Sequence, residues 1–311
     1  MTNLKMTSLL KEINETASCG DLKRLRILIA QSEKPSLEEA LELASRHGHD
    51  KCVKFIISFS DLKNHENHAL NWAAANGHAK CVKLLISNHE DDNGKALSLA
   101  SQNGHIECVK LLLPVSNPKN YNSQALRLAS ENGHVECVKL LIPLSEPKIN
   151  NNQALSLASL KGHTECVKLL IPVSDQKSKT DQALSLASLR GHAECVKLLI
   201  PIFDPKANNS QALKDASGNG HIECVKLLIP ASNPKAGNSY AMKFAAEGNY
   251  LDCVKLLLPY SDISRWNSST WSYIKDEMKQ NILSYFSKVS LSQNVLPSDD
   301  KILKLKKIHK I

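Results

Sequence analysis

A segment of about 29 residues recurs along this chain and constrains its fold more than any other feature of the sequence. Its most regular part reads Gly-His-x-Glu-Cys-Val-Lys-Leu-Leu, and five copies of it begin at Gly104, Gly133, Gly162, Gly191 and Gly220. Degenerate copies begin at residues 20, 48, 77 and 249. Self-similarity at such a period predicts a stack of repeats around one continuous core. In such a stack the repeated positions build the frame, so we expect function at the positions that vary between copies.

Each copy predicts two helices joined by a tight turn. In residues 121–150 the first helix is expected to follow an N-cap at Ser123, whose hydroxyl oxygen can accept a bond from a first-turn N–H. Gly133 is expected to end this helix in the left-handed conformation, and the second helix to end at Pro143. In the ninth copy the glycine slot holds Asn249, a residue type that tolerates that conformation. The other copies place small polar residues or glycine in the N-cap slot: Asn67, Gly94, Asn152, Asp181, Ser210 and Ser239.

The pattern L-x-L-A-S-x-x-G-H-x-E-C-V-K-L-L-I resembles the ankyrin repeat, with its two helices and the Gly-His turn between them. The resemblance covers about four-fifths of the chain and implies an all-α, helix–turn–helix repeat solenoid of about nine repeats. Two departures stand out. The period is shorter than the family's, which is about 33 residues, and the Thr-Pro-Leu-His opening is absent. The missing residues fall where the family has its β-hairpin fingers, so we expect shortened loops in their place.

The same resemblance suggests how the chain is divided. We expect residues 1–34 to form an N-terminal capping repeat and residues 35–258 to hold about eight further repeats. Residues 259–311 are expected to form a C-terminal helical cap and a basic tail. Solenoids require terminal caps with a polar outer face for solubility.

Cysteine and histidine, which often form chemical sites, each recur once per repeat. Equivalent positions on packed helices lie ~8–10 Å apart, whereas a disulfide needs Cα atoms within about 7 Å and zinc needs four ligands around one centre. We therefore interpret the cysteines as packing residues rather than metal or redox sites, and the histidines as residues that bond the loop and start the second helix. We expect no catalytic residue, cofactor or metal. The cysteines are Cys52, Cys81, Cys108, Cys137, Cys166, Cys195, Cys224 and Cys253. The histidines are His49, His78, His105, His134, His163, His192 and His221.

The chain is basic, with a net charge of +8 and a pI near 8.9. One lysine recurs on each second helix and others recur in the loops, so a basic stripe for nucleic acid or an anionic membrane is one interpretation. In five copies a glutamate precedes the helix lysine by three residues, within reach to neutralise it. Few aromatic residues interleave with the loop lysines, which leaves base stacking unsupported. A solvated face is the other interpretation, and the one that we prefer.

Some residues break the repeat and are candidates for partner binding. The pair before the turn glycine is usually polar, but it becomes Leu160–Lys161 and Leu189–Arg190 in two adjacent copies. Nearby, Phe203 replaces a loop serine. Exposed leucines, a loop aromatic and two cations would form a hot-spot patch for a protein partner, whereas drift among duplicated repeats is the alternative. Arg127, in the first helix of an earlier copy, completes the set of candidate contact residues.

The slot that holds Leu128 in the first helix is expected to face the core. Trp72 fills this slot in an early copy and is expected to be a core residue. Asp215 fills it in a late copy, where a carboxylate in an apolar layer would be costly without a partner. Either this layer is locally open or Asp215 reaches a neighbouring donor.

The C-terminal segment departs from the repeat altogether. Residues 270–288 predict an amphipathic helix whose apolar face covers the last repeat. The tail at 301–311 alternates apolar and basic residues, which fits either a membrane-surface helix or a second layer of cap. The apolar residues expected to cover the last repeat are Trp271, Ile274, Met278, Ile282 and Phe286.

These features favour a non-enzymatic scaffold or adaptor that binds a protein partner, and we expect it to be a monomer. A basic solenoid that binds nucleic acid or an anionic membrane surface is the alternative, and an enzyme with its chemistry in residues 259–311 is a third hypothesis that lacks a nucleophile–base pair. Nine cysteines without a Cys-x-x-Cys pair, no long apolar run and no apolar leader predict a cytoplasmic protein. The uniform copies resemble those of ankyrin-like effectors of intracellular bacteria and large viruses, which would place the chain in a host cytosol.

Overall fold

A computed structural model describes residues 2–32, 35–59, 66–86, 93–175, 182–264 and 266–292. Within these ranges the chain is helical and contains no β-strand, so the predicted all-α repeat fold is confirmed. Short 3-10 helices follow several second helices, where the family would have fingers: η1 (Leu113–Val115), η2 (Ile142–Leu144), η3 (Ile171–Val173) and η4 (Leu258–Tyr260). No helix of these residues is long and apolar enough to cross a membrane.

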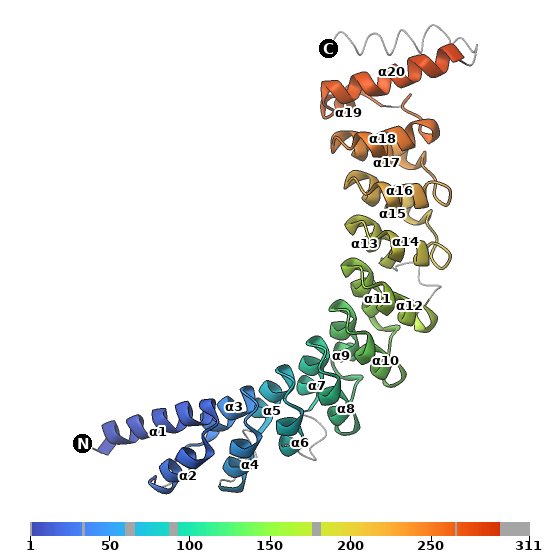
Figure 1. Cartoon of the computed structure of the whole chain (residues 1–311). Helices are drawn as coiled ribbons and strands as arrows, with labels where there is room; N and C mark the ends of the chain where they lie inside the picture. Colours follow the sequence, from blue (N-terminus) through green and yellow to red (C-terminus); the bar gives the residue numbers. More distant parts are fainter. Residues whose placement is uncertain are drawn as a thin grey trace. The chain divides into compact units, whose positions relative to one another are not determined.

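The chain divides into two compact units. Unit 1 comprises residues 1–155 and 172–174, and unit 2 comprises residues 156–171 and 175–311. In unit 1 the first helix of each repeat packs against the first helix of the next, and the second helices do the same (Figure 1). Its first helices are α1 (Thr2–Cys19), α3 (Glu38–Arg46), α5 (Glu66–Ala75), α7 (Asn93–Gln102) and α9 (Asn120–Glu131). Its second helices are α2 (Leu22–Ala30), α4 (Asp50–Phe59), α6 (Ala79–Leu85), α8 (Ile106–Leu112) and α10 (Val135–Leu141).

Unit 2 repeats this arrangement and adds two terminal helices (Figure 1). Helix α11 (Ile149–Lys161) begins in unit 1 and ends in unit 2. The other first helices are α13 (Ala183–Arg190), α15 (Ala207–Gly218) and α17 (Ala236–Glu247). The second helices are α12 (Thr164–Leu170), α14 (Ala193–Leu199), α16 (Ile222–Leu228) and α18 (Leu251–Leu257), and the terminal helices are α19 (Ser268–Ser272) and α20 (Asp276–Ser292). The predicted domain boundaries after residues 34 and 258 stay a prediction.

The core of each repeat comes from the repeated apolar positions of both helices. Leu126 and Ala129 of α9, and Val138 and Leu141 of α10, are fully buried. Burial of a leucine or valine side chain contributes about 1.5–3 kcal/mol, and the same positions are filled in every layer. The frame is therefore stabilised by many small, equivalent contributions rather than by one large central core.

The turn between the two helices has the predicted left-handed backbone. The glycine φ values lie between 74° and 79° at residues 20, 48, 77, 104, 133, 162, 191 and 220. In the ninth copy Asn249 adopts φ 62°, which confirms the assignment of this slot from its sequence. The two helices of a repeat are thus joined by a tight turn that a β-branched residue could not form without strain.

The slot predicted to be an N-cap has a different role. Ser123, Ser210 and Ser239 have positive φ values of 56°, 59° and 62°, and their hydroxyl oxygens accept backbone N–H groups of the following loop. The donor lies 23 residues further along the chain, at 2.8–2.9 Å. The N-cap prediction is therefore wrong for these serines, because the shortened loop at the end of the same repeat comes close enough to donate a backbone N–H to the hydroxyl oxygen.

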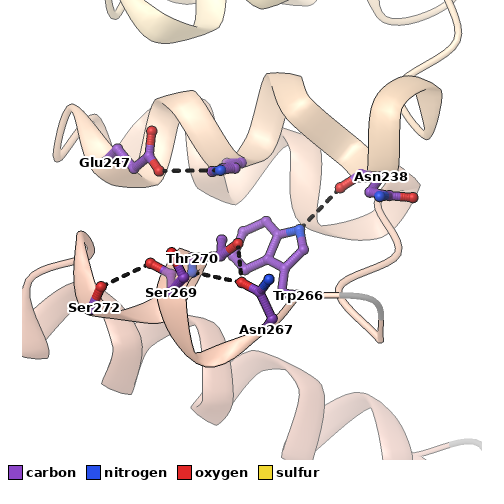
Figure 2. Close-up of polar contacts among 8 residues, drawn as sticks. Asn238, Glu247, Trp266, Asn267, Ser269, Thr270 and Ser272 are labelled. Atoms are coloured by element: carbon purple, nitrogen blue, oxygen red, sulfur yellow. Dashed lines mark hydrogen bonds and ion pairs between the residues drawn. The ribbon is translucent and has the colours of Figure 1, made fainter.

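The C-terminal segment covers the last repeat of unit 2, as predicted. Trp271, Ile274, Met278 and Ile282 are at most 3% exposed, whereas Phe286 is partly exposed. The indole N–H of Trp266 donates to the carbonyl oxygen of Asn238 at 3.0 Å, and the Asn267 side chain caps α19 by accepting the N–H of Thr270 at 2.9 Å (Figure 2). The predicted single helix is in fact two, α19 and α20, with a break at residues 273–275. The 301–311 tail lies outside the described residues.

Candidate interaction surface

The histidine that follows each turn glycine joins neighbouring repeats. Nε2 of His192 lies 3.0 Å from the carbonyl oxygen of Leu160, and Nε2 of His221 lies 2.9 Å from that of Leu189. Because a carbonyl oxygen only accepts hydrogen bonds, Nε2 carries the hydrogen. The prediction that histidine starts the second helix is confirmed, but its bond goes to the preceding repeat instead of its own loop. The same bond is made by His49, His78, His105 and His134.

The imidazole also explains why the turn holds glycine. A Cβ atom added at Gly191 would lie 2.5 Å from Nδ1 of His221, and one at Gly162 would lie 2.5 Å from Nδ1 of His192. Glycine is therefore required for two reasons: the backbone has a positive φ, and the imidazole ring leaves no space for a Cβ atom. In the ninth copy Tyr250 takes the place of histidine, and its ring covers Gly220. The histidine side chains therefore have a structural role, because they join neighbouring repeats.

The cysteines of the repeats are buried packing residues, as predicted. All eight are at most 1% exposed. Burial raises the pKa of the Cys81, Cys108, Cys166, Cys224 and Cys253 thiols to about 11. The described residues contain no cluster of histidine, cysteine and carboxylate side chains that could hold a metal ion. Cys19, outside this series, is exposed.

Four lysines of the second helices are neutralised by the glutamate one turn earlier. The Nζ–Oε1 distance is 2.7 Å for Lys110–Glu107 and 2.6 Å for Lys139–Glu136. Lys168–Glu165 and Lys226–Glu223 repeat the pair at 2.6 and 2.7 Å. These pairs are exposed, so each stabilises the fold by only about 0.3–0.5 kcal/mol. Their main consequence is electrostatic, because in α8, α10, α12 and α16 the positive charge of the lysine is balanced by the negative charge of the glutamate.

A row of apolar side chains on the first helices faces outward, which the sequence did not reveal. Leu128, predicted to face the core, is only partly buried, and so are its equivalents Leu157 and Leu186. Trp72 in the same slot is 39% exposed, so its prediction as a core residue is wrong. The guanidinium of Arg46 lies over the Trp72 ring, 4.5 Å from its centroid. The slot lies one turn before the pair at Leu160 and Leu189, on the same helix face.

In unit 2 we call the apolar residues at these positions the first-helix strip. Leu157 and Leu160 lie on α11, and Leu186 and Leu189 lie on α13, all partly buried. On α17 the strip continues as Phe244, which is 41% exposed. Partly buried apolar side chains in a row on neighbouring helices are typical of a protein contact surface.

The strip is interrupted on α15 by a hollow. There the two leucine slots hold Asp215 and Gly218, so neither supplies a large side chain. The resulting hollow of about 380 Å³ is lined by both residues and by Phe244. A Cβ atom added at Gly218 would lie 3.2 Å from the Phe244 Cβ, which shows how closely the next helix approaches.

Both alternatives that the sequence left open for Asp215, a locally open layer and a neighbouring hydrogen-bond donor, are found in the structure. The slot is partly open to solvent, and Oδ1 also accepts a hydrogen bond from Nε2 of Gln211 at 2.7 Å. Burial raises the pKa of the Asp215 carboxyl, while the Gln211 bond and Lys214 oppose the shift. A carboxylate at the edge of an apolar strip can fix the orientation of a partner's polar group.

Comparison with known proteins identifies the repeat. A family model described as ankyrin repeats (three copies) matches residues 13–95, 87–153, 144–211 and 184–268. The chain belongs to the ankyrin-repeat family. Ankyrin repeats are generally protein–protein interaction modules. A search of curated proteins found no significant match. Among solved structures, the human ASB11 ankyrin repeat domain is 24% identical with a TM-score of 0.47, over 64% of this chain and 95% of that one.

The predicted contact residues of this ankyrin-repeat chain differ in exposure and are divided between the two units. Lys161 and Arg190 are exposed beside the leucines of the strip. Arg127 belongs to unit 1, where its Nη1 donates to Oε1 of Gln153 at 3.0 Å. Phe203 is only 9% exposed, so it offers little surface to a partner, and its role in partner binding stays a prediction. The same slot is buried in two other repeats of this chain, where Ser174 and Ser232 are 7% and 9% exposed.

The sequence predicted one leucine of the strip on each of α11 and α13 but missed the second leucine, one turn earlier on the same helices. The leucines at 160 and 189 were visible as departures from a polar pair. The row at 128, 157 and 186 was hidden because leucine there looks like a core residue. The signal that could have revealed it is the variation in this slot, which holds tryptophan, aspartate and phenylalanine in other ankyrin repeats of the chain.

Proposed function

We propose that the chain is a non-enzymatic scaffold that binds a protein partner through the first-helix strip of unit 2. The observation that carries the proposal is the row of partly buried leucines on α11 and α13 beside the hollow at Asp215. The repeated cysteines and histidines are used by the frame, so recognition is left to the positions that vary. The partner would present apolar side chains to the leucines and one projecting side chain to the hollow, as in an interface with a buried centre and a polar rim.

The experiment is capture of the partner followed by mass spectrometry, with variants chosen from the chain's own repeats. Leu160→Gln/Leu189→Gln introduces at both sites the residue that Gln102 provides in an equivalent slot, so the fold should be retained. Leu144→Gln is the matched control, because Leu144 is 47% exposed and lies in η2, which contributes no residue to the strip. We expect the double variant to lose partners that the wild type and the control retain. Equal capture by all three proteins would reject the proposal.

The role as an effector in a host cytosol stays a prediction, as do a cytoplasmic location and a monomeric state. Uniformity of the copies supports the effector role by resemblance alone. Identification of the captured partner tests it, since an effector would bind a protein of another organism. Size-exclusion chromatography with light scattering tests the monomer.

A further inference from the structure

The second helices of the first three repeats differ from all later ones in charge. Where copies four to eight have a glutamate, and copy nine has Asp252, three residues before the helix lysine, copies two and three have Lys51 and Lys80. The first copy has Lys23 at this position. The acidic half of the repeated ion pair is therefore replaced by a cation in three adjacent repeats. Helices α2, α4 and α6 together carry seven lysines and arginines and a single carboxylate, Asp50.

Six of these cations are exposed and project from neighbouring helices. Helix α4 packs against both α2 and α6, so the three helices lie side by side in unit 1. The seventh cation, Arg24, is paired with Glu12. The other six form no ion pair within the part of the chain that the structure describes. They are Lys23, Arg26, Lys51, Lys54, Lys80 and Lys83.

An apolar side chain stands beside each pair of cations. Ile27 and Leu84 are 58% and 38% exposed, and Phe55 fills the equivalent position on α4. These residues follow the first cation of each helix by four positions, so they share its face. The guanidinium of Arg26 lies over the Phe55 ring, 5.3 Å from its centroid, and connects α2 to α4. We call this surface of six cations and three apolar side chains the basic face.

We propose that the basic face binds an acidic amphipathic helix of a protein partner. Charge complementarity selects a partner with carboxylates, and the row of Ile27, Phe55 and Leu84 requires apolar side chains between them. Neighbouring helix axes lie about 8–10 Å apart, and seven residues of a helix rise about 10 Å. A partner helix with one apolar residue in each seven, flanked by Asp or Glu, therefore matches the spacing of the row.

Two other ligands match this surface less well. Nucleic acid would use the cations but leave the exposed Ile27 and Leu84 without a role. Arg26 already covers the ring of Phe55, the aromatic residue of this face that could stack on a base. A lipid surface would need a larger apolar area to insert than three separated side chains supply. Both ligands are included in the test.

The test is a binding titration of the full chain with a helical peptide of about three heptads, in which one leucine per heptad is flanked by glutamates. The decisive variant is Lys51→Glu/Lys80→Glu, which restores in two repeats the ion pair seen at Glu107–Lys110 and so keeps the fold. We expect this variant to bind the peptide at least about tenfold more weakly, with the difference shrinking at high salt. Ile27→Ala should also weaken binding, whereas Leu160→Gln/Leu189→Gln should leave it unchanged, since the basic face does not depend on the proposed role of the first-helix strip.

Matched reagents make the result decisive. Glu107→Lys extends the basic face onto α8 and should tighten peptide binding. A peptide with glutamine in place of glutamate, and one with alanine in place of leucine, should both bind weakly. The proposal is overturned if the wild type does not bind the acidic peptide, or if Lys51→Glu/Lys80→Glu binds the peptide as tightly as the wild type does. It is also overturned if the charge reversal weakens binding of duplex DNA or phosphatidylserine vesicles but not of the peptide. The segment 87–92, outside the described residues, contains Glu90, Asp91 and Asp92. Peptide binding that appears only after their neutralisation would assign the face to that segment and overturn the proposal.

Discussion

Replacement of Gly191 by alanine tests how consecutive repeats are joined. The residue ends α13 with φ 77°, and the His221 ring of the next repeat covers it. A methyl group at this position therefore creates two separate problems. The backbone is left in a left-handed conformation, and the imidazole, 2.5 Å from the new atom, has to move.

The two effects have comparable magnitudes. A left-handed alanine costs about 1–2 kcal/mol relative to glycine. Displacement of the ring breaks its hydrogen bond to the Leu189 carbonyl oxygen, which contributes about 0.5–1.5 kcal/mol. We therefore expect Gly191→Ala to lower the free energy of unfolding by about 1.5–3.5 kcal/mol in total.

A double-mutant cycle separates the two effects. In the His221→Ala background no ring covers the new methyl group, so only the backbone cost remains. The double variant should thus be more stable, by about 1 kcal/mol, than the sum of the single changes predicts. Asn249→Ala is the control, because Asn249 has the same backbone at φ 62° but no histidine of a following repeat covers it. Urea unfolding followed by circular dichroism measures each variant. Additive effects in the cycle, or equal losses for Gly191→Ala and Asn249→Ala, would refute the coupling between turn and ring.

Three further predictions follow from burial. In the native protein a thiol reagent should label Cys19 rapidly and the eight repeat cysteines only after unfolding, because the eight side chains are buried and burial raises the pKa of every one of these thiols. Rapid labelling of several thiols would contradict the packing role. Phe203→Ser should lower the free energy of unfolding by about 3 kcal/mol in urea titrations, and wild-type stability would show that the ring is not buried. Because burial raises the pKa of Asp215, the native state takes up a proton at higher pH than the unfolded chain does. The stability of the wild type relative to Asp215→Asn should therefore rise as pH falls towards the pKa of the unfolded chain. A difference that is constant with pH, or that falls on acidification, would contradict this sign.

The features that the sequence predicted depend on contacts within one repeat. The period, the left-handed turn at Asn249 and the Glu136–Lys139 pair are local consequences of residue type and helix spacing. Burial of the cysteines and of Trp271 was also predictable, since both follow an apolar helix face. Residue type and helix spacing within one repeat were therefore sufficient to predict the roles of these repeated residues.

The features that the sequence missed depend on how segments that are not adjacent in the sequence lie relative to one another. The Ser210 hydroxyl resembles an N-cap until the next loop is placed within hydrogen-bonding reach of it. The histidine contact requires the position of the preceding carbonyl oxygen. The outward direction of Leu157 depends on how far the neighbouring first helix covers it, and leucine alone does not indicate this. Phe203 is buried although it lies in a loop, which residue type and loop position alone do not indicate.

The central claim is that the repeated residues build the frame while the variable positions of the first-helix strip bind the partner. The most direct measurement replaces Leu186, in the strip, with a photocrosslinking amino acid and compares it with the same replacement at Leu144. We predict a specific adduct with the captured protein from position 186 that is lost in Leu160→Gln/Leu189→Gln, and none from position 144. An adduct from position 144 alone, or one from 186 that survives the double change, would contradict the claim.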